Sequence, residues 1–357
     1  MPALGRFPAQ GNARSVGRRE MKYRRLGNSG LLVSELALGT MTFGEIGDRH
    51  VSEAEAQRQI DLYVDRGGNH LDVANVYAGG RAEAIVGQAI KGRRSRLVIS
   101  TKVRWPMGEA PNEAGLSRYH IMQAVEDSLR RLSVDAIDLL YMHGWDALTP
   151  LEESLRAFDD LVRAGKVRYI GVSNFSAWQA MKGLGLSQAK GWAPFVAAQY
   201  QYSLVVRDIE NDVLGVAEAE GMGLVPWGAL GGGFLSGKYR RDVRPTSSAD
   251  GRIATAPDAW EESWARRATA QNWQIVDAVE ETSRAHPGAS TAQVALAWTL
   301  AKRGVASVIV GARSEAQLED NLGAASLRLT EEEIALLDRV SAVPAPYPAR
   351  AVNLVAR

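Results

Sequence analysis

Four side chains that can exchange protons or charge follow consecutive apolar segments of the chain. Asp72 and Tyr77 lie in "LDVANVYAGGRAE", Lys102 ends "VISTK" and His143 ends "DLLYMH". Free tyrosine titrates near pH ~10, and a neighbouring ammonium lowers that value because it favours the tyrosinate. A carboxylate would keep the lysine charged, and a histidine could orient a carbonyl oxygen by a hydrogen bond. The four types together predict an acid–base centre built around Tyr77.

A tyrosine that protonates a carbonyl oxygen needs a second reactant. The carbonyl carbon must receive a hydride at the same time, and amino-acid side chains supply none. The residues therefore predict a nicotinamide cofactor and a small-molecule carbonyl or alcohol substrate.

Short apolar segments alternate with longer amphipathic segments from about residue 36 to residue 326. Each short segment has the continuous apolar character of a strand that is buried on both faces. The expected strands are "ELALGT", "NHLDVA", "RLVISTK", "AIDLLYMH", "VRYIGVSN", "FVAAQYQ", "GLVPWGA" and "VASVIVGA". The expected helices are 52–66, 81–92, 118–132, 150–164, 176–185, 208–220, 291–303 and 314–325. Eight such pairs predict an α/β protein with a (β/α)8 TIM barrel, whose active site lies at the C-terminal ends of the strands. A doubly wound open sheet is the alternative, because eight strands do not prove closure.

Two segments lie outside this repeat. Residues 22–33, with "GNSG" at their centre, predict an N-terminal β-hairpin that covers the barrel floor. Residues 229–290 form a long insertion after the seventh strand, with a helical stretch near 261–284, and long barrel loops are usually functional lids. The expected organisation is a disordered extension over 1–20, one domain over 21–343 and a tail over 344–357.

The overall composition excludes several classes of function. The chain has 42 basic and 41 acidic residues, so its net charge of +1 gives no reason to expect nucleic acid or an anionic membrane as partner. It has no cysteine, which excludes disulfides, thiol catalysis and Cys-bound zinc and fits a cytoplasmic location. No apolar run approaches the ~18 residues of a membrane helix. The oligomeric state is left open.

One stretch imitates a different nucleotide site. "GGGFLSGKY" reads G-x-x-x-x-G-K from Gly232 to Lys238, like the phosphate loop of nucleoside triphosphatases. Tyr239 stands where that loop needs a Mg²⁺-binding hydroxyl, and no helical pattern follows at once. The five histidines also show no pair at ligand spacing before a suitable carboxylate, so no metal site is expected.

Several motifs in the right order give the chain a clear resemblance. They are "LGTMTFG", "GKVRYIGVSNF", "QYQYS", "LVPWGALGGGFLSGKY" and "VGARSEAQLEDN", together with the four residues described above. The sequence resembles the aldo-keto reductases from Tyr23 to about Val340. The resemblance implies the (β/α)8 fold, a catalytic tetrad of Asp72, Tyr77, Lys102 and His143, and a cofactor that is NADPH in preference to NADH, without excluding NADH.

The resemblance also assigns cofactor contacts. It places Ser173, Asn174 and Gln199 on the nicotinamide carboxamide and Trp227 against its ring. It folds the glycine-rich stretch over the pyrophosphate, where the backbone can approach closely and Lys238 can add a charge. The remaining expected contacts are Thr40, Met41, Asp72, Gly228, Leu230, Gly232, Gly233, Leu235, Gly237 and, for adenine, Asn321.

The 2′-phosphate site departs from the family pattern. Some relatives have a lysine and an arginine where this chain has Gly311 and Gln317. Arg313 and Ser314 remain at the start of the last expected helix, and a helix N-terminus beside an arginine can hold a phosphate. A solvated loop charge is the alternative interpretation of Arg313.

Three tryptophans are the expected substrate wall. Trp105, Trp145 and Trp178 are expected in loops just after the third, fourth and fifth strands. Together with Trp227 they indicate a carbonyl compound with an apolar or ring-bearing body. Trp298 is expected in the core, and Trp260, Trp264 and Trp273 are expected to pack the lid. Because some members of the resembled family, the potassium-channel β subunits, regulate a partner, a cofactor-binding interaction subunit is the alternative to an enzyme.

Overall fold

The computed structural model describes residues 21–44, 51–246 and 251–353. The predicted extension over 1–20 lies outside these residues. Eight parallel strands form one sheet in the order β10-β3-β4-β5-β6-β7-β8-β9. The strands are β3 (Leu36–Gly39), β4 (His70–Asp72), β5 (Val98–Val103), β6 (Ile137–Met142), β7 (Val167–Ser173), β8 (Phe195–Gln199), β9 (Gly223–Leu224) and β10 (Val308–Val310).

The strands β10 and β9 stand at the two ends of this order. Backbone hydrogen bonds also join these two strands, so the sheet closes on itself. Leu224 of β9 donates to the carbonyl of Gly304 (2.9 Å) and accepts from Ala306 (2.8 Å), and Ile309 of β10 donates to Pro226 (2.8 Å). The predicted (β/α)8 barrel is confirmed, and the open doubly wound sheet is wrong.

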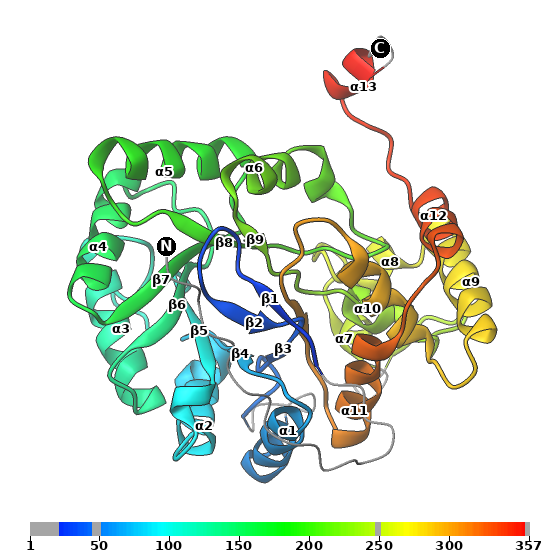
Figure 1. The fold of residues 1–357 in the computed structure, drawn as a ribbon, viewed down its shortest axis with the longest axis horizontal. Coiled ribbons are helices and arrows are strands. Elements are labelled where there is room, and N and C mark those ends of the chain that lie inside the picture. Colours follow the sequence, from blue (N-terminus) through cyan, green and yellow to red (C-terminus); the bar gives the residue numbers. More distant parts are fainter. Residues whose placement is uncertain (1–20, 45–50, 247–250, 354–357) are drawn as a thin grey trace, which may run out of the picture.

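Helices surround the strands in chain order (Figure 1). The helices are α1 (Glu53–Asp65), α2 (Arg81–Ala89), α3 (Arg118–Leu132), α4 (Leu151–Arg163), α5 (Ala177–Lys190), α6 (Val213–Glu220), α10 (Thr291–Ala301) and α11 (Glu315–Gly323). The 3-10 turns of the described residues include η1 (Tyr77–Gly80), η2 (Arg94–Arg96), η3 (Asp208–Asn211), η4 (Gly231–Ser236) and η6 (Ala324–Ser326). The predicted helix over 208–220 is therefore two elements, and that over 176–185 continues to Lys190.

Capping residues start several of these helices as the sequence predicts. The Ser52 hydroxyl accepts from the Glu55 amide at the start of α1, and Ser314 does the same for Gln317 at the start of α11. Such caps satisfy amides that the first helical turn leaves unpaired. They fix where each helix begins relative to the strand before it.

The N-terminal hairpin pairs β1 (Tyr23–Arg25) with β2 (Leu32–Ser34) in antiparallel register and confirms the prediction. Leu26 and Val33 of this hairpin are fully buried in one cluster with barrel residues such as Leu139 and Tyr141. The hairpin therefore covers the end of the barrel opposite the C-terminal ends of the strands.

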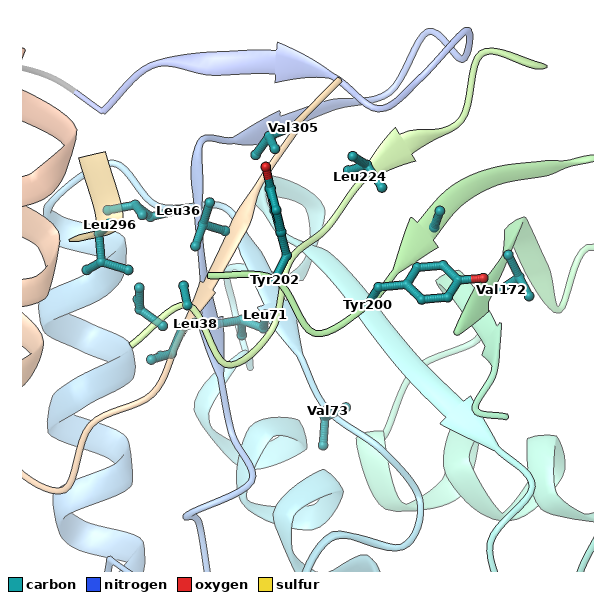
Figure 2. Close-up of a cluster of buried hydrophobic side chains, with 14 of the residues drawn as sticks. Leu36, Leu38, Leu71, Val73, Val172, Tyr200, Tyr202, Leu224, Leu296 and Val305 are labelled. Carbon is teal, nitrogen blue, oxygen red and sulfur yellow. The ribbon is translucent and has the colours of Figure 1, made fainter. Parts of the chain in front are cut away.

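The main core lies between the strands and the helices. Alternate residues of a strand point to opposite faces, so Leu139 and Tyr141 of β6 enter the barrel while Leu140 and Met142 face the helices. Figure 2 shows part of the outer cluster, with Leu36 and Leu38 of β3 beside Leu296 of α10. Burial of such side chains contributes about 25 cal/mol per Å² and stabilises the strand ends that carry the site.

The insertion after β9 carries α7 (Arg252–Thr255), α8 (Trp264–Arg267) and α9 (Ala270–Ala285), so the predicted helical stretch is broken after Arg267. Trp264 and Trp273 pack on Phe234, as expected for lid residues, whereas Trp260 is exposed and does not. Trp298 is fully buried, which confirms its place in the core.

Two helices that follow the last repeat in the described part of the chain were not predicted, and neither was α7 of the insertion. The two are α12 (Glu331–Val340), which begins with a capping box between Thr330 and Glu333, and α13 (Ala349–Asn353). Figure 1 shows α12 beside α9 and α13 extending away from the barrel. The region predicted as a tail therefore contains a helical turn.

Candidate active site

The alternation of strand residues places the reactive side chains in layers inside the barrel. His70 and Asp72 of β4 share the inner face with Ser100 and Lys102 of β5, and Asp72 is the register partner of Ser100. In the lower layer, the ring nitrogens of His70 contact the hydroxyls of Ser100 (3.1 Å) and Ser307 (3.3 Å). The upper layer holds Asp72 and Lys102, almost wholly removed from solvent.

The Asp72 carboxylate is fully occupied by donors. Its Oδ1 accepts from Lys102 Nζ (2.5 Å), and its Oδ2 accepts from Ser100 Oγ and Gln199 Nε2, each at 2.8 Å. A buried carboxylate needs this compensation, because removing it from water costs several kcal/mol. Asp72 is therefore held rigidly and acts on its surroundings through Lys102.

Lys102 connects Asp72 to Tyr77. Its Nζ also donates to the Val73 carbonyl (2.8 Å) and to Tyr77 Oη (3.3 Å). Burial opposes the charge on Lys102, but the attraction of Asp72 and then of Tyr77 outweighs it, so the pKa of the ammonium lies above its ordinary value. A permanent positive charge therefore contacts the phenol oxygen.

Tyr77 is positioned by a sharp turn and not by a strand. The chain leaves β4 and enters η1, where Ala78 (φ 49°), Gly79 (φ 62°) and Gly80 (φ 95°) have left-handed backbone conformations. Such conformations are uncommon for residues with a Cβ and common for glycine. The turn brings the Tyr77 side chain back over the barrel, where it is partly exposed and can meet a substrate.

His143 completes the group at the end of β6. Its ring lies edge-on to the Tyr77 ring, with centroids 6.2 Å apart, and its Nδ1 is buried without a hydrogen-bond partner among the described residues. Burial, together with the charges of Lys102 and Arg104, holds the pKa of His143 well below its usual range. The imidazole is therefore neutral at pH 7 and can donate or accept a hydrogen bond.

The residues predicted to contact a nicotinamide lie at the ends of neighbouring strands. Ser173 Oγ donates to the Gln199 carbonyl (2.8 Å), and Asn174 Nδ2 donates to the His143 carbonyl (3.0 Å). Asn174 has a left-handed backbone (φ 55°) and an exposed side chain. Because the Gln199 amide also contacts Asp72, the predicted carboxamide contacts and the tetrad form one connected network.

Thr40 and Met41 were both predicted to contact the cofactor, but they differ in solvent exposure. The Thr40 hydroxyl is fully buried and donates to the Asp72 carbonyl (3.0 Å), which joins β3 to β4. Met41 is 39% exposed and is free to contact a ligand with its side chain. The structure thus gives Thr40 a structural contact and leaves only its neighbour accessible.

The glycine-rich stretch follows directly after β9, at the same end of the barrel. Trp227, half-buried, pairs its backbone with Gln201, and a run of left-handed glycines follows at Gly228, Gly231, Gly232, Gly233 and Gly237. Leu230 and Leu235 belong to the same turn: the Leu235 amide donates to the Leu230 carbonyl (3.1 Å). Lys238 Nζ lies 3.3 Å from the position that a Cβ on Gly233 would occupy, so its charge folds back over the glycines.

The donors around this stretch fit a bound anion. Arg267 of the insertion is 4% exposed, and its Nε and Nη2 have no hydrogen-bond partner among the described residues. Its Nε lies 4.0 Å from the position of a Cβ on Gly231. Burial lowers the pKa of Arg267, and the attraction of Glu262, which forms its ion pair with Arg252 (2.7 Å), does not outweigh it. A buried guanidinium without a partner is costly, so a phosphate group at the glycines would satisfy it.

The N-terminus of α11, predicted to hold the 2′-phosphate, has most of its amides occupied. The Arg313 amide donates to the Gln317 side chain (3.0 Å), and the Gln317 amide donates to Ser314 (3.3 Å). The Glu315 amide donates to Glu55 of α1 (2.9 Å). Burial opposes the charge of Glu55, but hydrogen bonds from Arg58, Gln59 and the Glu315 amide outweigh it, so its pKa lies below the usual range. An ionised carboxylate thus lies where an anion was predicted.

Asn321 and Gly311, the other two predicted residues of this region, contact each other. Asn321, 6% exposed, donates weakly to the Gly311 carbonyl (3.4 Å). Gly311 is open apart from the Gly39 carbonyl, which lies 3.7 Å from the position of its Cβ.

The three predicted substrate tryptophans do not form one group. Trp105 lies edge-on to His143 (6.1 Å), whereas Trp145 packs against Trp178 (5.6 Å) and Phe175 (5.2 Å). Trp178 is not in a loop, because it occupies the first turn of α5. Trp105 therefore has the most direct contact with the tetrad.

Three residues around the site were missed at the sequence level. Ser100 and Arg104 lie two residues either side of Lys102, so strand alternation would have placed all three on one face. Arg267 gives no such signal, because it comes from an insertion more than thirty residues after the glycines.

Two broader features complete the description. Within residues 21–44, 51–246 and 251–353, no group of three or more His, Cys, Asp or Glu side chains is arranged to hold a metal ion. Among the helices of the same ranges, none combines the length and apolar character needed to cross a membrane.

Comparison with known proteins agrees with this geometry. Residues 35–342 match the model of the aldo/keto reductase family. The chain is 37% identical over 341 residues to a protein of Arabidopsis thaliana named probable voltage-gated potassium channel subunit beta, covering 92% of this chain and 98% of that protein. It is 37% identical over 331 residues (90% and 96%) to the uncharacterized oxidoreductase YrpG of Bacillus subtilis. It is 32% identical over 355 residues (93% and 99%) to versiconal hemiacetal acetate reductase of Aspergillus parasiticus. The chain therefore belongs to the aldo/keto reductase family and is an oxidoreductase.

Proposed function

We propose that this protein reduces an aldehyde or ketone to an alcohol with NADPH, in a reversible reaction in which Tyr77 is the proton donor. The observation that carries the proposal is the Asp72–Lys102–Tyr77 connection, in which a buried ammonium contacts a phenol oxygen that substrate can reach. A bound nicotinamide dinucleotide would supply the hydride in this chemistry.

The residues divide the work by their surroundings. Lys102 lowers the energy of the Tyr77 phenolate that remains after the proton has moved to the carbonyl oxygen. Asp72 keeps Lys102 charged and in place. The neutral His143 ring donates a hydrogen bond to the same carbonyl oxygen and so fixes its orientation beside Tyr77. In the reverse direction, the tyrosinate accepts the proton of the alcohol.

The cofactor would be held at three places. Ser173, Asn174 and Gln199 offer amide and hydroxyl groups for the carboxamide, with Trp227 beside them. The glycine-rich stretch, Lys238 and Arg267 suit the pyrophosphate. The contacts proposed for the adenosine end are Arg313 and Asn321.

The preference for NADPH over NADH rests on Arg313 and on the N-terminus of α11. It is expected to be modest, because Glu55 occupies one amide of that terminus and carries a negative charge. The family generally uses NADPH, which supports the same choice.

The test is oxidation of NADPH, followed at 340 nm, with a broad panel of aldehydes and ketones. The proposal expects turnover of at least some of them by the parent. It also expects a loss in the Tyr77→Phe variant, with NADPH binding retained. Near-normal turnover by Tyr77→Phe on every substrate would contradict the assigned role.

A second candidate is a cofactor-binding regulatory subunit with little turnover. The observation that favours it is the 37% identity to the plant protein named as a probable channel β subunit. NADPH that binds, and is not consumed with any carbonyl of the panel, would favour this second function.

A further inference from the structure

Arg104 is a cation beside the candidate active site that no carboxylate of the described chain neutralises. Its guanidinium lies over the Trp105 ring, 4.0 Å from the centroid, and its Nη2 donates to the Trp145 carbonyl (3.2 Å). Its Nε is buried and has no hydrogen-bond partner among the described residues. The ion pairs within these residues, which include Arg94 and Arg118 on either side in sequence, do not include Arg104. A ligand with an acidic group would therefore find a guanidinium that has no acidic partner among the described residues.

Asp146 does not form an ion pair with Arg104. Asp146 feels the charge of Arg104, but three donors already hold its carboxylate. Its Oδ2 accepts from the Leu116 amide (2.8 Å) and from Thr149 Oγ1 (2.7 Å), and its Oδ1 accepts from the Leu148 amide (3.0 Å). Asp146 thus organises its own turn and leaves Arg104 without a carboxylate partner among the described residues.

A row of aromatic rings connects Arg104 to Tyr77. Tyr77 lies edge-on to His143 (6.2 Å), His143 lies edge-on to Trp105 (6.1 Å), and Arg104 stacks on Trp105. Its Cδ lies 4.0 Å from the position of a Cβ on Gly144, the residue after His143. The charge therefore lies two rings away from the phenol that is proposed to protonate the carbonyl.

We propose that Arg104 binds a carboxylate of the substrate, so that the substrates are carbonyl compounds that carry a carboxylate some bonds away from the carbonyl group. This inference rests on the proposed reductase function and names its substrate class. Stacking on Trp105 and one bond to a backbone carbonyl hold the guanidinium plane, and the terminal nitrogens, unlike the buried Nε, are left to meet a planar anion. Trp105 would at the same time contact the apolar body between the two groups.

The experiment compares 2-, 3- and 4-carboxybenzaldehyde with their methyl esters, which are neutral and similar in shape. The three isomers vary the distance between the carbonyl carbon and the charge. The readout is the ratio of kcat/KM for each acid to kcat/KM for its ester. This ratio cancels changes in cofactor binding and in the pKa of His143, because both compounds experience them equally.

The parent is expected to favour at least one acid over its ester. Arg104→Met should lower that ratio roughly 10- to 100-fold, the worth of one or two charge-assisted hydrogen bonds. Arg104→Lys keeps the charge and loses the planar fork, so its acid-to-ester ratio should lie between those of the parent and of Arg104→Met. Arg118→Met removes an arginine that pairs with Asp160 on the surface and should leave the ratio unchanged.

The outcomes separate this inference from the function on which it rests. Parent ratios at or below one for all three isomers, or equal ratios in parent and Arg104→Met, would overturn the carboxylate site while turnover of the esters upholds the reductase. Turnover of no carbonyl compound would overturn both. If Arg104→Met fails to fold, the acid-to-ester ratios of the parent and of Arg104→Lys still test the carboxylate site. A parent ratio near one, together with the same ratio in Arg104→Lys, would refute the site.

Discussion

The two ends of the proposed cofactor site are built on opposite principles. At the tetrad, Asp72 and Lys102 are almost completely buried, and each polar atom of the carboxylate has a donor. At the start of α11, Arg313 and Glu315 lie near the surface, and Glu55 brings a charge of the same sign as a phosphate. Changes at the first end should therefore cost much, because nothing can replace a lost partner in the absence of water. Changes at the second end should cost little and tune selectivity.

Tyr77→Phe is the most severe test of the tetrad. It removes one oxygen and leaves the Asp72–Lys102 pair intact, so the expected result is a fall in kcat of about 10²- to 10⁴-fold with little loss of stability. Steady-state rates and a fluorescence titration with NADPH measure the two effects separately. Loss of cofactor binding equal to the loss of rate would assign Tyr77 to binding and not to proton transfer.

Lys102→Met tests the charge balance of the same end. The change leaves the Asp72 carboxylate buried with only neutral donors, and breaking such a pair costs about 3–5 kcal/mol. The free energy of unfolding in urea should fall by this amount. The matched variant Lys102→Met with Asp72→Asn removes both charges and should recover a large part of it. A single variant as stable as the parent would show that the pair contributes nothing to the fold.

The layer below the tetrad should make stability depend on pH. Burial, offset by Asp72 and reinforced by Lys102, lowers the pKa of His70 from 6.5 to about 4. The unfolded chain binds a proton on this ring below pH ~6.5 and the folded chain only below about 4, so acid favours unfolding across that window.

The His70 contribution should decrease by roughly 3 kcal/mol as the pH falls from 6.5 to 4. Urea unfolding of the parent and of His70→Asn at pH 7, 6, 5 and 4.5 measures it. The variant should lose less stability per pH unit than the parent. Equal slopes for the two proteins would show that His70 titrates normally in the fold.

Sequence reasoning reached the buried end of the site and not the exposed end, for a physical reason. Asp72, Lys102 and His143 follow from strand alternation and from the rule that parallel strands present their C-terminal ends together. The same repeat predicted a barrel but did not prove its closure, which depends on the backbone hydrogen bonds between β9 and β10. Tyr77 was predicted from its chemistry together with the other three residues and not from strand alternation, because a turn with left-handed backbone conformations positions it.

The contacts that were not predicted join segments far apart in the chain. Glu55 of α1 reaches the amide of Glu315 in α11, and Arg267 reaches Gly231 from the insertion. No local pattern encodes such a meeting, since it depends on how two elements pack. The helix α12 was missed for a different reason: its capping box was present in the sequence but lay beyond the eight repeats.

The smallest expected effect concerns cofactor choice at α11, and it separates attraction from repulsion. Arg313→Ala should raise the KM for NADPH relative to NADH by about 2- to 5-fold, the worth of an exposed ion pair of ~0.5–1 kcal/mol. Glu55→Gln should shift the same ratio in the opposite direction by a similar factor, because it removes a negative charge and keeps a side chain that can accept from the Glu315 amide. Both shifts should shrink at high salt, whereas the effect of Lys102→Met should not, since screening acts on exposed charges. If Glu55→Gln and Arg313→Ala change the KM values for NADPH and NADH equally, the 2′-phosphate does not lie at this helix, and the contrast between the two ends is one of burial alone.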